Sequence, residues 1–177
     1  DISFQAEVNF TGFKTTGDRD HSSFYGLFGI SVFRVNPEAK LNGKWYELQP
    51  LGTEGQGTAA FNDRKPYSLT QLAIPTGIGF KHALDKHWSI GFELGLRFTF
   101  TDYIDDVSTT YVDDNILEST NGKASSLLSN RTGEVLPEGP RDLDSRNQRG
   151  DPTSNDGYHF VGFTVTYTVI PGNCYKF

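Results

Sequence analysis

The chain has 177 residues, which is enough for one domain of ordinary size. Its net charge of −6 and its lack of any Lys/Arg cluster argue against a general nucleic-acid-binding surface. No segment approaches the roughly 18 consecutive apolar residues of a membrane-spanning helix, yet 14% of the residues are aromatic, which is high for an acidic protein.

Alternation of apolar and polar residues predicts strands in the first part of the chain. A strand sends successive side chains to opposite faces, and residues 2–13 place apolar side chains at every second position. After a polar turn over residues 15–22, the segment Ser23–Val35 predicts a second strand. Leu27 and Phe33 fall on its otherwise small and polar face, so we expect a β-bulge there.

A long connection over residues 36–66 separates this strand from the next one. Its large apolar residues are Trp45, Tyr46, Leu48 and Leu51. A fully solvated loop rarely carries so many, so we expect part of the connection to fold over the mouth of a barrel. In the strand that follows, Tyr67–Lys81, Pro75 predicts a local break because proline cannot donate to the ladder. A tight turn at residues 82–87 comes next.

The segment His87–Tyr103 carries the most informative alternation. One series is small, polar or charged, and the other is Trp88, Ile90, Phe92, Leu94, Leu96, Phe98 and Phe100. A soluble strand usually has about 5–6 residues, whereas a tilted strand that crosses a bilayer needs roughly 9–11. Trp88 and Tyr103 lie near the two ends, where outer-membrane barrels carry aromatic girdles. The pattern favours a membrane-spanning strand over a long strand of a soluble sandwich or a lipocalin-like barrel.

Residues 102–157 form the longest region without a strand pattern. Loops of this length are usually functional or disordered, and residues 116–128 favour a helical turn within it. The last strand is predicted at Tyr158–Ile170, and Pro171 and Gly172 end it.

The order of these segments predicts an all-β fold: a small antiparallel transmembrane β-barrel, formed by a single domain over residues 1–177. Short turns alternate with long connections, as in outer-membrane barrels, so residues 36–66 and 102–157 are expected to be two long extracellular loops. Residues 171–177 are then a periplasmic C-terminal tail. Such barrels have an even number of strands, and eight is the smallest usual number. Because the pattern gives about five, we expect about three further strands ahead of Asp1 in the full protein.

Motifs that would indicate catalysis or metal binding are weak or absent in the sequence. The acidic stretch 102–114 does not match an EF-hand loop and is interpreted as a structured, solvated loop. The four His residues lack metal-ligand spacing, the GTEGQG at residues 52–57 lacks the ending of a phosphate-binding loop, and no nucleophile motif occurs. The RGD at residues 149–151 is a common tripeptide in polar loops. We therefore predict no enzymatic activity, no cofactor and no metal site.

Four charged residues fall on the polar faces of strands that are otherwise built for burial: Glu7, Lys81, Glu93 and Arg97. The lumen of an eight-stranded barrel is just wide enough to be filled by side chains, and buried charges must be paired. We therefore predict a lumenal network of these charges that fills the barrel rather than leaving a pore.

Four segments of the chain together resemble a known family. They are NPEAKLNGKWYELQPLGTEGQG, FTDYIDDVSTTYVDD, the RGD and the terminal NCYKF. In this order and spacing they resemble the PorG family, outer-membrane barrel proteins of the type IX secretion system in Gram-negative bacteria. The resemblance implies a small barrel associated with a periplasmic ring of a PorK-type lipoprotein and a PorN-type protein, without enzymatic activity.

The single cysteine, Cys174, lies in the predicted periplasmic tail, in a compartment that supports disulfides. The residues alone leave open an intermolecular disulfide, a reactive thiol or an incidental unpaired cysteine. The resemblance implies a disulfide from Cys174 to the ring lipoprotein, with Tyr175 and Phe177 as aromatic contacts beside it.

The sequence and the resemblance together predict a structural component of the type IX secretion system in the cell outer membrane. The expected partners are the lipid bilayer, the PorK-type lipoprotein and the PorN-type ring protein, and no nucleic acid. The alternative is an OmpA-like or lipocalin-like barrel that binds a small ligand or lipid.

Overall fold

The computed structural model of the protein describes residues 1–16, 19–136, 139 and 142–169. It is mostly antiparallel β-sheet with few helices, which confirms the all-β prediction. The chain divides into two compact units. The sheet unit comprises Asp1–Val32, Leu72–Thr99 and the described part of Gly157–Phe177, and the loop unit comprises Phe33–Gln71 and Phe100–Asp156.

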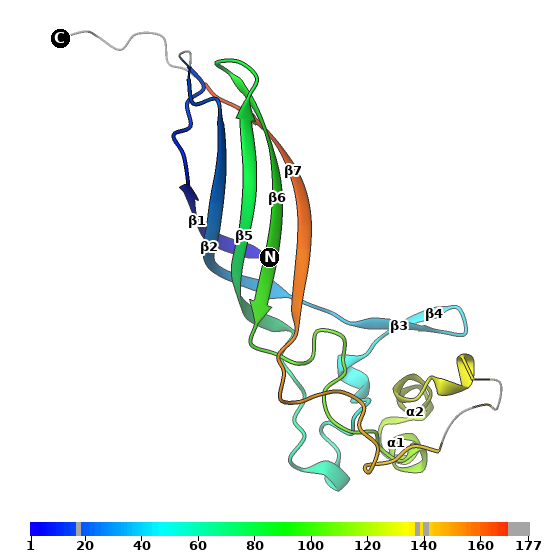
Figure 1. Cartoon of the computed structure of the whole chain (residues 1–177). Coiled ribbons are helices and arrows are strands. Elements are labelled where there is room, and N and C mark those ends of the chain that lie inside the picture. Colours follow the sequence, from blue (N-terminus) through cyan, green and yellow to red (C-terminus); the bar gives the residue numbers. More distant parts are fainter. Residues whose placement is uncertain (17–18, 137–138, 140–141, 170–177) are drawn as a thin grey trace. The chain divides into compact units, whose positions relative to one another are not determined.

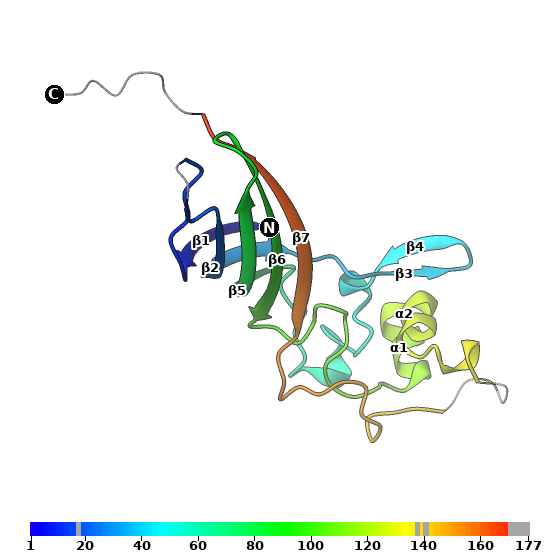
Figure 2. The same cartoon turned by 45° about the horizontal axis from the view of Figure 1, so that its top comes forward.

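Five long strands form one sheet, in the order in which the chain meets them (Figure 1). The five predicted strands are all present, with bounds that differ by a few residues. They are β1 (Ile2–Asn9), β2 (Ser22–Arg34), β5 (Thr70–Ala83), β6 (Trp88–Thr99) and β7 (Gly157–Tyr167). The sheet curves across its strands, as a comparison of Figures 1 and 2 makes clear.

Two irregularities predicted within these strands are absent from the described ladders. The β1–β2 register runs unbroken from Ile2 opposite Val32 to Asn9 opposite Tyr25, so the predicted bulge is wrong. The β5–β6 register likewise continues through Pro75, which lies opposite Arg97, so the predicted break is wrong. A proline removes one donor, and paired residues on both sides of it hold the register.

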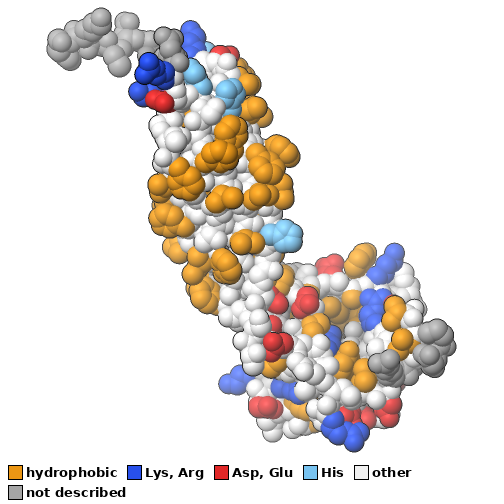
Figure 3. Space-filling view, viewed as in Figure 1, with side chains coloured by type: hydrophobic (Ala, Val, Ile, Leu, Met, Phe, Trp, Pro, Cys, Tyr) orange, Lys and Arg blue, Asp and Glu red, His pale blue; other side chains and the backbone are white. Residues whose placement is uncertain are grey.

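The two faces of the sheet differ in chemistry and burial. The outer face carries large apolar side chains, and many of them are exposed: Ile2, Phe4, Val8, Phe24, Phe28, Ile30, Val32, Leu72, Ile74, Ile78, Phe80, Trp88, Ile90, Leu94, Leu96, Phe98, Val161, Phe163, Val165 and Tyr167. Figure 3 shows apolar side chains spread over this unit. The inner face buries small and polar residues that include Ser23, Ser31, Ser89 and Arg97. Water-soluble proteins usually have the reverse arrangement, with large apolar groups inside.

Glycines on the inner face make room for rings from neighbouring strands. A Cβ atom added at Gly79 would lie 2.1 Å from Cζ of Tyr25, and one added at Gly95 would lie 2.1 Å from Cε1 of Phe160. Leu27, which was expected to disturb the strand, is buried on this same face. The inner face therefore accepts a few large side chains because its other positions are small.

The loop unit has secondary structure of its own. It contains the hairpin β3 (Glu38–Leu41) and β4 (Lys44–Glu47), three 3₁₀ turns at Gln49–Leu51, Ala59–Phe61 and Thr132–Glu134, and the helices α1 (Asp114–Asn121) and α2 (Lys123–Ser129). Asn42 and Gly43 turn the hairpin with positive φ angles of 50° and 83°, as a tight two-residue turn requires. The carboxylate of Asp113 caps α1 by accepting from the backbone N–H of Asn115 and Ile116.

The core of the loop unit is small and includes Leu48, Val112, Leu117 and Leu128. The predicted helical turn at residues 116–128 is confirmed as parts of two short helices. No helix in the described part of the chain has the length and apolar character needed to cross a membrane.

The contact between Gly79 and Tyr25 leads to a stability prediction. Gly79→Val should lower the free energy of unfolding by ~1–3 kcal/mol, the usual cost of overpacking, because the new side chain collides with the Tyr25 ring. Urea unfolding of the purified protein measures it. Gly162→Val is the matched control, because a Cβ atom at Gly162 meets nothing within 4 Å in the described structure. Equal losses in both variants would show that the ring contact is not the cause.

Candidate functional site

The outer face of the sheet is the largest candidate interaction surface. Phe4 and Phe163 are 85% and 82% exposed, and the surrounding side chains are also apolar. A continuous apolar surface of this kind marks contact with a protein, a ligand or a membrane.

An aromatic cluster lies at one end of this face. Trp88 and Tyr167 are register partners whose ring centroids are 4.9 Å apart, and His87 stacks on Tyr167 at 5.4 Å. Trp88 thus stands at the end of its strand, as predicted. Tyr103 belongs to the loop unit, where it stacks on Tyr67 at 4.6 Å.

The four predicted lumenal charges all lie on the inner face, but they form two groups. Lys81 pairs with Glu7, and its ammonium also lies 5.3 Å from the centroid of the Tyr25 ring. The Tyr25 hydroxyl donates to Oε2 of Glu93 at 3.1 Å, so Tyr25 joins this pair to Glu93. Sequence reasoning missed Tyr25, because its role depends on contacts between three strands.

Arg97 forms the second group of the inner face. Its Nε lies 3.5 Å from Oδ2 of Asp1, and its guanidinium lies 4.7 Å from the centroid of the Phe160 ring. The Nη1 atom of Arg97 is buried and has no hydrogen-bond partner within the described residues. The inner face therefore holds one neutral charge pair near Glu93 and one incompletely satisfied arginine.

The loop unit contains a third polar cluster, centred on Glu54. This side chain is fully buried. Oε1 accepts from the backbone N–H of Ser108 at 2.9 Å, and Oε2 accepts from the Thr109 hydroxyl at 2.7 Å and the Tyr103 hydroxyl at 3.2 Å. Nη1 of Arg149 donates to Oε1 at 3.1 Å. The carboxylate is thus paired and hydrogen-bonded, as a buried charge requires.

Asp106 lies beside Glu54 and is also fully buried. Its Oδ2 accepts from the Thr53 hydroxyl at 2.5 Å, and its Oδ1 accepts from the Tyr67 hydroxyl at 2.7 Å. Nη2 of Arg149 lies 3.8 Å from Oδ2, and Nη1 donates to the backbone carbonyl of Asp106 at 2.6 Å. One guanidinium therefore serves two buried carboxylates.

Burial shapes the protonation of this cluster. It raises the pKa of the Asp106 carboxyl, although the hydrogen bonds from Thr53 and Tyr67 act in the opposite direction. It also raises the pKa of the Tyr67 hydroxyl, with the hydrogen bond to Asp106 as the second cause. Desolvation in a site that excludes water is the largest cause of both shifts, and the nearby Arg149 guanidinium acts against them.

The cluster ties together parts of the loop unit that are far apart in sequence. Arg64 extends it, because Nη1 donates to the Glu54 carbonyl at 2.8 Å and Nη2 donates to the Thr110 hydroxyl at 2.6 Å. We call Glu54, Asp106, Arg149 and their hydrogen-bond partners the loop clasp.

Among the described residues, no group of three or more His, Cys, Asp or Glu is placed to hold a metal ion.

The loop clasp corrects one interpretation made from the sequence. Asp106 was assigned to a solvated acidic loop, but it is buried, while Asp105 beside it is exposed. Arg149 of the RGD is also buried at its side chain. The only sequence signal was that Glu54, Asp106 and Arg149 all lie in segments that resemble one family, and the resemblance did not indicate that they meet.

The predicted contact residues Cys174, Tyr175 and Phe177 lie outside the described residues, so their placement remains a prediction.

Comparisons with known proteins give one partial match. A family model described as a domain of unknown function, DUF6089, matches residues 54–126, which is less than half of the chain. This region begins at Glu54 and includes Asp106 but not Arg149. No curated protein and no solved structure matches the chain significantly.

The shared arginine of the loop clasp gives a second stability prediction. Arg149→Leu should cost ~3–5 kcal/mol of unfolding free energy, because it leaves two buried carboxylates without a cation. Arg146→Leu should change stability little. It removes an arginine three positions away whose described charge partner, Asp144, is local and whose side chain is 87% exposed. Urea unfolding of both variants makes the comparison, and similar costs would contradict a central role for Arg149.

The same variant should respond to pH. Because the folded-state pKa of Asp106 is raised, the folded protein binds a proton more readily than the unfolded chain, so acidification through this pKa favours folding at this site. Arg149 lowers this pKa, so its loss should raise the pKa of Asp106 further in Arg149→Leu. The deficit of the variant relative to wild type should therefore shrink as the pH falls from 7 towards 3.8, the ordinary pKa of an Asp carboxyl. Unfolding curves across this range test the direction, and a deficit that grows on acidification would contradict it.

The backbone of Asp106 distinguishes two substitutions. Its φ is 69°, in the left-handed region that Asn and Asp tolerate best among non-glycine residues. Asp106→Asn should keep this backbone and one of the two accepted hydrogen bonds, while its Nδ2 amide donates to the oxygen of the other hydroxyl, so its stability should stay within about 1 kcal/mol of wild type. Asp106→Ala should lose ~2–3 kcal/mol, because it leaves buried hydroxyls unpaired. Comparable losses in the two variants would contradict this assignment.

Proposed function

We propose that the protein is a structural β-barrel of a bacterial outer membrane, and that it serves a type IX secretion system by linking a periplasmic ring to that membrane. The observation that carries the membrane part is the inverted sheet, with exposed large apolar side chains on the outer face and buried polar ones on the inner face.

Strand length supports the same reading. The strands β2, β5, β6 and β7 have 13, 14, 12 and 11 residues, and a tilted strand that crosses a bilayer needs roughly 9–11. In water the outer face would be an aggregation hazard. In lipid it is the expected surface of a barrel, with an aromatic cluster such as Trp88 and Tyr167 at the level of the headgroups.

The proposal requires more strands than the sheet contains. A sheet in a bilayer must close, because unpaired backbone groups at its edges are costly in hydrocarbon. The smallest usual barrel has eight strands, and this sheet has five. About three further strands would close it between β1 and β7. Nη1 of Arg97 has no hydrogen-bond partner within the described part of the chain, and an inward-facing acceptor on such strands would supply one.

The secretion role is supported by the resemblance of four segments to the PorG family. Two of these segments contain Glu54 and Asp106, and a third contains Arg149, so the resemblance falls on residues that have a physical reason to occur together. In the same proposal the barrel is an anchor rather than a pore, because the inner face is occupied by side chains such as Tyr25, Phe160 and Lys81.

Insertion of a charge into the outer face tests the membrane location. Leu94→Arg should destabilise the folded protein in a bilayer by ~2–4 kcal/mol, the cost of arginine near the midplane of a barrel. Leu127→Arg in the loop unit is the matched control, because the two leucines are 43% and 42% exposed. Folding into liposomes, followed by electrophoretic mobility before and after heating, measures both variants. A detergent-free, monomeric wild-type protein would overturn the membrane proposal.

The link to the ring is tested separately at Cys174. A disulfide to a ring lipoprotein should give a higher-mass species in non-reducing electrophoresis of membranes. This species should disappear on reduction and be missing in Cys174→Ser. If the wild type and the variant both run as the monomer, the proposed bond does not exist, although the membrane location could still hold.

A further inference from the structure

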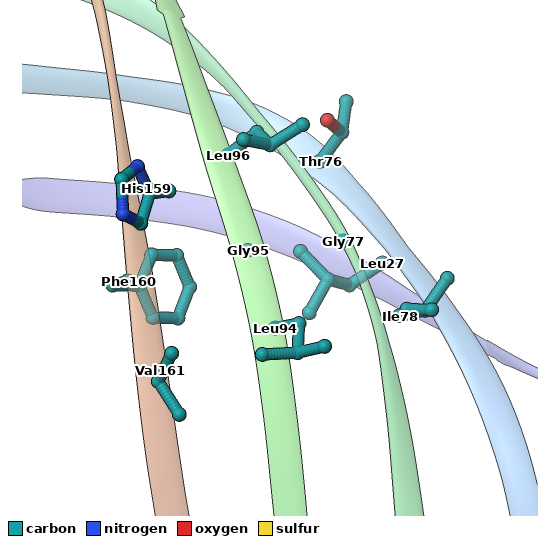
Figure 4. Close-up of a pocket in the computed structure, with 10 residues that line it drawn as sticks. All are labelled: Leu27, Thr76, Gly77, Ile78, Leu94, Gly95, Leu96, His159, Phe160 and Val161. Atoms are coloured by element: carbon teal, nitrogen blue, oxygen red, sulfur yellow. The ribbon is translucent and has the colours of Figure 1, made fainter.

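The outer face of the sheet contains apolar grooves between successive cross-strand rows of side chains. The largest has a volume of about 590 Å³, and two others have about 280 and 220 Å³. All three lie within the sheet unit. Figure 4 shows the residues that line the largest groove, which come mainly from β5, β6 and β7.

The strand register defines the walls and floor of the largest groove. One wall is the row Thr76, Leu96 and His159, and the other is the row Ile78, Leu94 and Val161. The floor between them is the backbone of Gly77 and Gly95, which are direct register partners. On the inner face, the space that these glycines leave is occupied by Leu27 and the Phe160 ring, which also line the groove.

The spacing of the walls suits a hydrocarbon chain. The two rows are two residues apart along each strand, which corresponds to about 7 Å. Carbon atoms in van der Waals contact are ~3.5–4.0 Å apart, so one chain of methylene groups between the rows contacts both walls. The groove runs across the strands, and because strands of a barrel are tilted, it is inclined to the membrane normal.

The polar groups of the groove lie in only one of its walls. Thr76 and His159 occupy the same row, separated by Leu96, while the opposite wall is apolar. His159 is the third residue of β7, and this row lies towards the strand ends that lead into residues 100–156. In the topology proposed above, this is the cell-surface end of the strands.

We propose that this groove binds one acyl chain of a membrane lipid whose phosphate-bearing headgroup accepts hydrogen bonds from His159 and Thr76. The inference rests on the proposed membrane location. A lipid fits better than a protein segment, because the groove is continuous with an apolar face and no Lys, Arg, Asp or Glu lines it.

Native mass spectrometry of the detergent-solubilised protein tests the site. The probes are phosphatidylglycerol and a diacylglycerol with the same chains, offered in equal amounts. The wild type should retain one phosphatidylglycerol in preference to the diacylglycerol. Leu94→Trp, which places a large ring in the groove, should lower retention of both lipids about tenfold. His159→Leu should keep chain binding but lose the preference for the phosphate-bearing lipid.

Phe28→Trp is the matched control, since Phe28 is exposed on the outer face and lies outside this groove. Heat-modifiable electrophoretic mobility verifies that each variant is folded, and Ile78→Trp on the same wall replaces Leu94→Trp if that variant does not fold. Equal lipid retention in wild type, Leu94→Trp and Phe28→Trp would overturn the inference. It would also be overturned if the wild type copurified with a bound protein rather than a lipid, and Leu94→Trp lost that protein. A protein that needs detergent yet retains no lipid refutes the groove alone, whereas a detergent-free soluble monomer refutes the membrane proposal as well.

Discussion

Space on the inner face of the curved sheet is the constraint on which the sheet unit depends. Tyr25 and Phe160 occupy positions where a neighbouring strand offers Gly79 or Gly95 instead of a side chain. A large side chain on one strand thus requires a missing one on the next, because interiors are packed close to the density of crystals. Most of the other large apolar residues of these strands lie on the outer face, where side chains of neighbouring strands do not restrict their size.

The loop unit is held by a different interaction. Its apolar core is small, and its buried polar residues carry an excess of acid, with Glu54 and Asp106 around Arg149. Buried ion pairs are rarely a large source of net stability, but removal of one partner is costly. The loop clasp therefore specifies one arrangement of the connecting segments and penalises others.

The sequence was sufficient to locate the five strands, because a period of two is a local property that each strand displays by itself. It failed at Leu27 and Pro75, whose effect depends on what the neighbouring strand offers. It failed more completely at Asp106 and Arg149, which are polar residues in polar stretches and are buried only because Glu54 lies beside them. The four charges predicted to line a lumen lie on the face opposite the exposed apolar residues, but their division into two groups required the contacts of Tyr25 and Asp1.

The separation of Glu54 and Arg149 has a consequence for the order in which the chain can fold. Arg149 comes 95 residues after Glu54, and it stands eight positions before β7 begins at Gly157. Contacts that close so long a loop form late, since their entropy cost comes before their benefit. Until the segment that contains Arg149 folds back onto residues 54–106, Glu54 and Asp106 lack their shared cation, and the loop unit is incomplete. The loop unit therefore reaches its final hydrogen-bonded arrangement only when the segment directly before β7 is in place.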